Sequence, residues 1–88
     1  MSEALEIASK ARKLAPQDPS LADTYAWILH RSGDSAGALP VLRQAAQALP
    51  DNEAVRLHLV EVLKAVGRVD EAQRLYKLIE ENRRVNPQ

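Results

Sequence analysis

The stretch LAPQDP at residues 14–19 returns as ALPDNE at residues 48–53, so that Pro16 and Pro50 lie 34 positions apart. The same shift superimposes small residues elsewhere in the chain: Ala4 on Ala38 and Ala72, Ala11 on Ala45, and Gly33 on Gly67. A fixed period of this size is the signature of a stacked structural repeat. The sequence therefore predicts a protein built from copies of one unit.

On either side of the repeated stretch, apolar residues recur at helical spacing between breaks at Pro16, Gly33, Pro50 and Gly67. We expect helices over residues 3–14, 19–32, 36–48 and 53–66. A fifth should open near residues 70–71 and run out in the polar tail 80–88, where Pro87 ends it. Five helices without any segment of period two predict an all-α fold.

Residues suited to helix ends stand at the expected places. Asp18, Asp34-Ser35 and Asp51 or Asn52 can cap the helices that follow them. Pro40 falls near the first turn of its helix, where we expect it to be tolerated. The inward rows should be Ala4, Ile7, Ala8, Ala11 and Leu14; Ala38, Leu42, Ala45 and Leu49; Val55, Leu59, Val62, Leu63 and Val66; and Ala72, Leu75, Tyr76 and Ile79.

Composition excludes several classes of protein. The 88 residues suffice for one small domain with a core of Ala, Leu and Val, because only three residues are aromatic: Tyr25, Trp27 and Tyr76. Twelve basic residues balance twelve acidic ones, which argues against a nucleic-acid partner. The absence of cysteine excludes disulfide and thiolate-zinc sites.

No basic leader and no apolar run of membrane-spanning length is visible, so we expect a soluble chain without direct membrane contact. The compartment stays open between the cytoplasm and, for a piece of a longer exported protein, the periplasm.

Taken as one unit, residues 19–52 carry a set of residues at characteristic places: Ala22, Tyr25, Ala26, Leu29, Ala38, Leu42, Ala45 and Pro50. This pattern resembles the tetratricopeptide repeat family, in the form of a fragment of a bacterial-type array. Residues 53–88 repeat it as a terminal unit with a polar tail, with Arg56, Leu59, Val60, Leu63, Ala72, Tyr76, Ile79 and Arg84 at the eight places. Residues 1–18 match only a second helix, through Ala4, Ala8, Ala11 and Pro16.

The resemblance implies one structural domain over residues 1–88, a right-handed α-solenoid of antiparallel helix pairs. In this family the first helix of each pair lines a concave face. The corresponding stripe here gives the candidate partner-binding groove: Asp23, Trp27, His30, Arg31, Leu57, Glu61 and Lys64. Trp27 among charges has the composition of a peptide-binding hot spot.

Plainer interpretations stand beside this one. Trp27 could instead pack against the first helix or against the first helix of the next unit. Asp23, Glu61 and Lys64 could form a solvated face. A partner's C-terminal carboxylate, which some family members bind, is disfavoured because Asp23 and Trp27 replace the expected Lys and Asn.

We expect no catalytic, cofactor-binding or metal-binding residues. His30 and His58 lie 28 positions apart on different helices, and each lacks a companion ligand at i+4. Glu80 and Glu81 are consecutive and diverge on a helix, which makes them a poor acid/base pair. No phosphate-binding loop or Ser/His/Asp grouping is visible.

The resemblance favours a scaffold module that binds a peptide or protein partner in the concave groove. One alternative is a purely structural segment of a longer array, for instance one accessory to an assembly or secretion system. Another is a regulatory domain of an enzyme. We also expect self-association through the first helix, because no preceding helix covers Leu5 and its neighbours.

Overall fold

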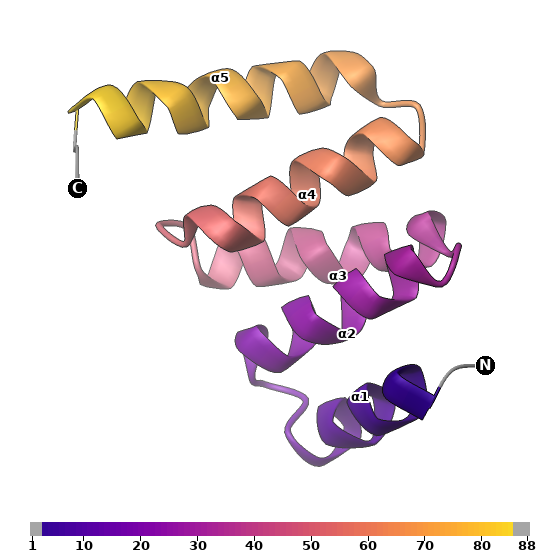
Figure 1. The fold of residues 1–88 in the computed structure, drawn as a ribbon. Helices are drawn as coiled ribbons and strands as arrows, with labels where there is room; N and C mark the ends of the chain where they lie inside the picture. The colour runs from indigo at the N-terminus through magenta and orange to yellow at the C-terminus, as the bar shows by residue number, and fades with distance from the viewer. Residues whose placement is uncertain (1–2, 86–88) are drawn as a thin grey trace.

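A computed structural model describes residues 3–85, and within that range it contains five helices and no strand. The helices are α1 (Glu3–Leu14), α2 (Pro19–Arg31), α3 (Ser35–Ala48), α4 (Glu53–Ala65) and α5 (Val69–Val85), as Figure 1 shows. The predicted all-α fold is confirmed. The expected helix end at Pro87 lies outside the described residues, as do the outermost residues of the predicted domain.

The 34-residue period reappears in the positions of the helices. The bounds of α4 are those of α2 shifted by the period, and α5 begins at Val69 as α3 begins at Ser35. Likewise, α1 ends at Leu14 and α3 at Ala48. Each copy of the period therefore folds into the same local structure.

Side-chain caps begin the helices where the sequence predicted them. The Asp18 carboxylate accepts hydrogen bonds from the backbone N–H groups of Ser20 and Leu21, at 2.9 and 3.3 Å. Asp34 accepts from Gly37 N–H and Asn52 from Val55 N–H. These bonds satisfy backbone donors that have no partner inside the helix.

Pro40 is tolerated inside α3, as predicted, and the helix begins at Ser35, one residue earlier than expected. At the sixth helical position the missing N–H removes one backbone hydrogen bond and leaves the helix continuous.

Glycines in the left-handed region end the first helix of each pair. Gly33 has φ +104° and Gly67 φ +88°. In both turns the N–H of the residue after the glycine reaches five residues back, from Asp34 to the Leu29 carbonyl and from Arg68 to the Leu63 carbonyl. This hydrogen-bonding pattern stabilises a sharp reversal, which makes successive helices antiparallel.

The last helix continues into the polar tail, as expected, and includes residues 80–85. Pro16 and Pro50 stand in the turns after α1 and α3, whereas Arg84 occupies that place in the second unit. Within the described residues no proline interrupts α5, which continues through Val85. An ion pair between Arg83 Nε and Glu53 Oε1, 2.7 Å apart, ties its end to the start of α4.

The helices pack as a layered stack in which each contacts its neighbours in sequence and α2 also contacts α4 (Figure 1). The largest cluster of buried side chains joins both pairs and contains Ala26, Ala38, Leu42, Leu59, Val60, Val62, Leu63, Ala72 and Ile79. Alanine at the closest approaches of the helices leaves room for larger neighbours. The stack measures 39 × 26 × 18 Å.

The first helix packs with only part of the predicted row: Ala8 is buried and Ala11 half-buried. Leu5 is 6% exposed because α1 lies against α2, where Arg12 also stands over the Tyr25 ring, 5.4 Å from its centroid. The expectation that Leu5 is uncovered is therefore wrong. Ala4, Ile7 and Leu14, which we expected to be buried, are exposed, since no second described helix contacts α1.

Candidate partner-binding groove

Four side chains from α2 and α4 form a polar and aromatic cluster between the two units. Asp23 Oδ1 and His58 Nδ1 are hydrogen-bonded at 2.9 Å. The His58 ring stacks on Trp27 with centroids 4.1 Å apart and an interplanar angle of 17°. The His30 ring lies 5.1 Å from the Trp27 ring, centroid to centroid, and its Nδ1 is 2.7 Å from Ser35 Oγ.

Two of the seven candidate residues, Asp23 and Trp27, thus make contacts between units, whereas His30 contacts residues of its own unit. Trp27 packs against the first helix of the next unit, which is one of the two plainer interpretations of this residue. The solvated-face interpretation of Asp23 is wrong, because its side chain is only 14% exposed and pairs with His58. The periodic pattern did not indicate that His58 contacts both Asp23 and Trp27.

A groove of about 730 Å³ opens between α4 and α5. We call it the α4–α5 groove; it is lined by Leu57, Val60, Glu61, Lys64, Val69, Ala72, Gln73, Tyr76, Lys77 and Glu80. Its floor is apolar and its rim carries two acidic and two basic side chains. Such a surface suits the apolar face of a peptide or helix.

Three of the candidate residues line the α4–α5 groove. Leu57 is half-buried in its wall, whereas Glu61 and Lys64 are exposed on its rim and form an ion pair of 3.6 Å. The solvated-face interpretation thus describes these two charges. Arg31 is exposed at the end of α2 and lines none of the α4–α5 groove.

Sequence reasoning missed the contribution of α5 to this groove. Tyr76 was expected to point inward, but it is exposed on the groove wall, and Lys77 and Val69 stand nearby on the same helix. The period held a clue: the residue 34 positions before Tyr76 is Leu42, which is fully buried. The two differ because α4 covers Leu42, whereas no described helix packs over Tyr76.

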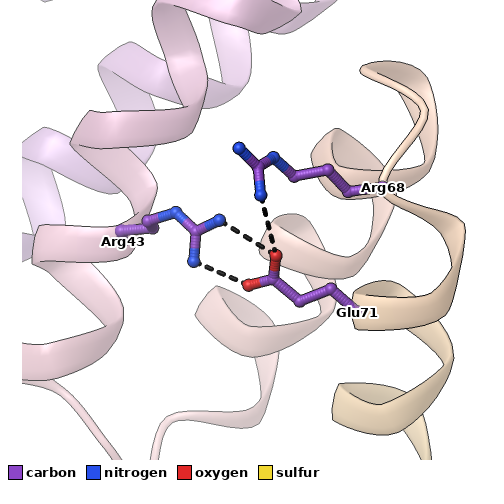
Figure 2. A network of polar contacts seen from close by, with 3 residues as sticks. All are labelled: Arg43, Arg68 and Glu71. Atoms are coloured by element: carbon purple, nitrogen blue, oxygen red, sulfur yellow. Dashed lines mark hydrogen bonds and ion pairs between the residues drawn. The ribbon is translucent and has the colours of Figure 1, made fainter.

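A charged network on the stack holds α5 against α3 (Figure 2). The Arg43 guanidinium donates two hydrogen bonds to the Glu71 carboxylate, at 2.7 and 3.1 Å, and Arg68 lies 3.5 Å from the same group. Hydrogen bonding from Arg43 lowers the pKa of Glu71 below its ordinary value. The bidentate geometry favours one position of α5 relative to α3.

Within residues 3–85 no group of three or more metal-binding side chains gathers at one place. None of the described helices is long and apolar enough to cross a membrane. What the described surface offers is an apolar groove with a charged rim.

Comparison with known proteins agrees with this architecture. A family model described as tetratricopeptide repeat matches residues 29–88. Over 59 residues, or 67% of its length, the chain is 49% identical to a TPR repeat-containing protein of Pseudomonas aeruginosa. The match spans 10% of that relative's length. The search of solved structures found no significant match.

Proposed function

Because the chain belongs to the tetratricopeptide repeat family, whose repeats generally mediate protein–protein interaction, we propose that its α4–α5 groove binds a segment of a partner protein. The family is typically non-catalytic, and a scaffold role without catalysis is part of the proposal. The predicted division into a half repeat at 1–18 and units at 19–52 and 53–88 places this groove on the terminal unit.

The observation that carries the proposal is the exposed apolar wall of the α4–α5 groove. Val69 is 47% exposed, and Tyr76 is also exposed. Both stand on the side of α5 that faces the groove, so apolar surface there is open to solvent. Covering apolar surface contributes roughly 25 cal/mol per Å². A partner that covers these side chains would gain affinity from the wall, while the charged rim would set its orientation.

A selection from a displayed library of random 16-residue peptides tests this function. Peptides enriched on the whole chain should lose binding to the Val69→Lys variant and keep it on the Leu78→Lys variant. Leu78 is a matched control, since it is 56% exposed on the same helix but lines no part of the α4–α5 groove. Enrichment of peptides that bind both variants equally would contradict the proposal.

Trp27→Ala is unsuited to this test. Trp27 stacks on His58 between the units, so its removal would loosen the stack and weaken any partner contact indirectly. Lys64→Ala is the better probe of the candidate stripe on the first helix of each pair, because Lys64 is exposed on the rim.

A structural role within a longer array is the second candidate function. It is favoured by the likeness between the α4–α5 groove and the surface on which α4 packs within this chain, since a following repeat would fill the groove in the same way. Under this alternative the peptide selection would enrich no sequence that depends on Val69.

Self-association through α1 is also proposed. The exposed row of Ile7 and Leu14 is flanked by acidic residues in the first turn of the helix, Glu3 and Glu6, and by basic residues in its second half, Lys10 and Lys13. Two antiparallel α1 helices would bury both rows and bring opposite charges together in a two-fold interface, in which both chains use the same surface.

A further inference from the structure

The chain contains a filled copy of its own open groove. Each residue of the α4–α5 groove has a counterpart 34 positions earlier on α2 and α3, and α4 packs over that earlier surface. The contrast between Leu42, fully buried, and its exposed counterpart Tyr76 reflects this covering. The way in which α4 fills the first surface is therefore a template for what the second surface accepts.

In the filled copy, α4 contributes an apolar row and one polar side chain. Val55 is buried with Ala22 and Ala45, while Leu59 and Val62 join the large core cluster. These residues stand at i, i+4 and i+7 along α4. His58, at i+3, lies beside the row and reaches the pair formed by Asp23 and Trp27.

The open copy has different residues where His58 is received. The counterpart of Asp23 is the apolar Leu57, and the counterpart of Trp27 is Glu61, which is exposed on the rim. A side chain in the His58 position of a docked helix would lie along Leu57 and end near Glu61. An aliphatic stem with a cationic head meets both requirements, which describes arginine or lysine.

The residues that receive Val55 have counterparts outside the groove lining, Arg56 and Ile79, so the template sets only the other positions. Numbering from the residue that corresponds to Val55, we propose that the α4–α5 groove takes an amphipathic helix with apolar residues at i+4 and i+7 and a basic residue at i+3, which pairs with Glu61. This rests on the proposed function and names the chemistry of the partner. The Glu61–Lys64 contact of 3.6 Å between two exposed side chains is weak enough for an incoming guanidinium to replace it.

The other charged groups of the rim are compatible with a single basic contact. Lys77 and Glu80 lie on α5, on the opposite wall from Glu61. The counterpart of Lys77 is Arg43, and its partner Glu71 lies on α5 and not on α4, the helix that fills the first surface. By the same template, Lys77 does not pair with the docked helix. The basic residue of that helix is therefore left to pair with Glu61.

Synthetic peptides made from α4 itself, residues Glu53–Ala65, test this specificity. The H58R peptide should bind the whole chain about fivefold or more tightly than the H58E peptide, measured by fluorescence anisotropy of labelled peptide. The L59E peptide, which breaks the apolar row, should not bind. Binding of H58R should be lost on Val69→Lys and kept on Leu78→Lys, which excludes displacement of the chain's own α4.

The charge-swapped protein Glu61→Arg supplies the decisive comparison. Glu61 is exposed, so the variant should melt like the parent by circular dichroism. It should reverse the preference and bind H58E more tightly than H58R. Groove-dependent binding of both peptides without any preference would overturn the basic-residue inference and leave the proposed function standing. Failure of all three peptides, alongside success of the library selection, would overturn the helix inference alone.

Discussion

Ala4, Ala38 and Ala72 lie 34 positions apart but differ in how deeply they are buried. Ala38 is 0% exposed and Ala72 is also buried, where the two helices of each unit approach closely. Ala4 occupies the corresponding position in α1 and is exposed. Small size is therefore required at Ala38 by its neighbours.

Ala38→Leu should destabilise the protein by roughly 1 to 3 kcal/mol, because three extra carbon atoms must enter a filled interface. Ala4→Leu makes the same chemical change at the corresponding exposed position and should alter stability by less than about 0.5 kcal/mol. Urea unfolding followed by circular dichroism measures both. Equal effects of the two substitutions would contradict the helix pairing described above.

At the scale of the helix, the local signals for starts and stops act independently of packing. Asp18, Asp34 and Asn52 cap three helices through their side chains, and Gly33 and Gly67 end two. The length of α5 follows from the same logic, since Arg84 stands where a proline would have ended it.

Gly67→Ala should destabilise the protein by about 1 kcal/mol, because a side chain is strained at φ +88° although open space surrounds the position. Gly67→Asn should cost less, since asparagine adopts the left-handed region more readily. Thermal melting of the two variants separates backbone strain from contact. A Gly67→Ala melting point equal to the parent's would argue against a left-handed residue at this turn.

At the scale of the molecule, the stack is held by contacts between successive helices and by a few longer-range pairs. The Arg43–Glu71 pair joins α3 to α5, and the Asp23–His58 pair joins α2 to α4. In such an arrangement each unit depends on its neighbour for stability.

The lowered pKa of Glu71 predicts a loss of stability in acid. A carboxylate whose pKa is lower in the folded than in the unfolded protein stabilises the fold above its ordinary pKa, and this contribution is lost as pH falls through the lowered value. Between pH 7 and pH 3 the parent should therefore lose more stability than Glu71→Gln. We expect a difference of at most about 1 kcal/mol, since both partners of the pair are partly exposed to solvent.

Urea midpoints at the two pH values measure this difference. Glu53 also has a lowered pKa, through its hydrogen bond from Arg83, and adds to the acid sensitivity of both proteins equally. An identical loss in the parent and in Glu71→Gln would show that the Arg43 pair does not contribute.

Self-association should depend on the exposed face of α1. Light scattering over increasing concentration should show dimers of the parent, and Ile7→Lys should weaken dimerisation by at least about tenfold, because Ile7 is 62% exposed in the centre of the proposed interface. Leu78→Lys, on a helix outside the interface, should leave it unchanged. A parent that stays monomeric at the highest concentration would rule this interface out.

Much of the fold could be read from the amino-acid sequence because its signals are local. Proline and glycine restrict the backbone wherever they stand, and Asp or Asn caps act over three residues, so helix bounds and the repeat were correct to within a few residues. The family followed from the same pattern, as the match over residues 29–88 confirms.

The exposure of particular side chains required the packed structure. Periodicity placed Trp27, Leu57 and Glu61 on one stripe, yet α4 supplies His58 against Trp27 while the other two face an open groove. For the same reason, Leu5 is buried although it was expected to be exposed, and Tyr76 is exposed although it was expected to be buried. Whether a helix face is buried depends on which distant segment packs on it, and the spacing of residues within that helix carries no record of the neighbour.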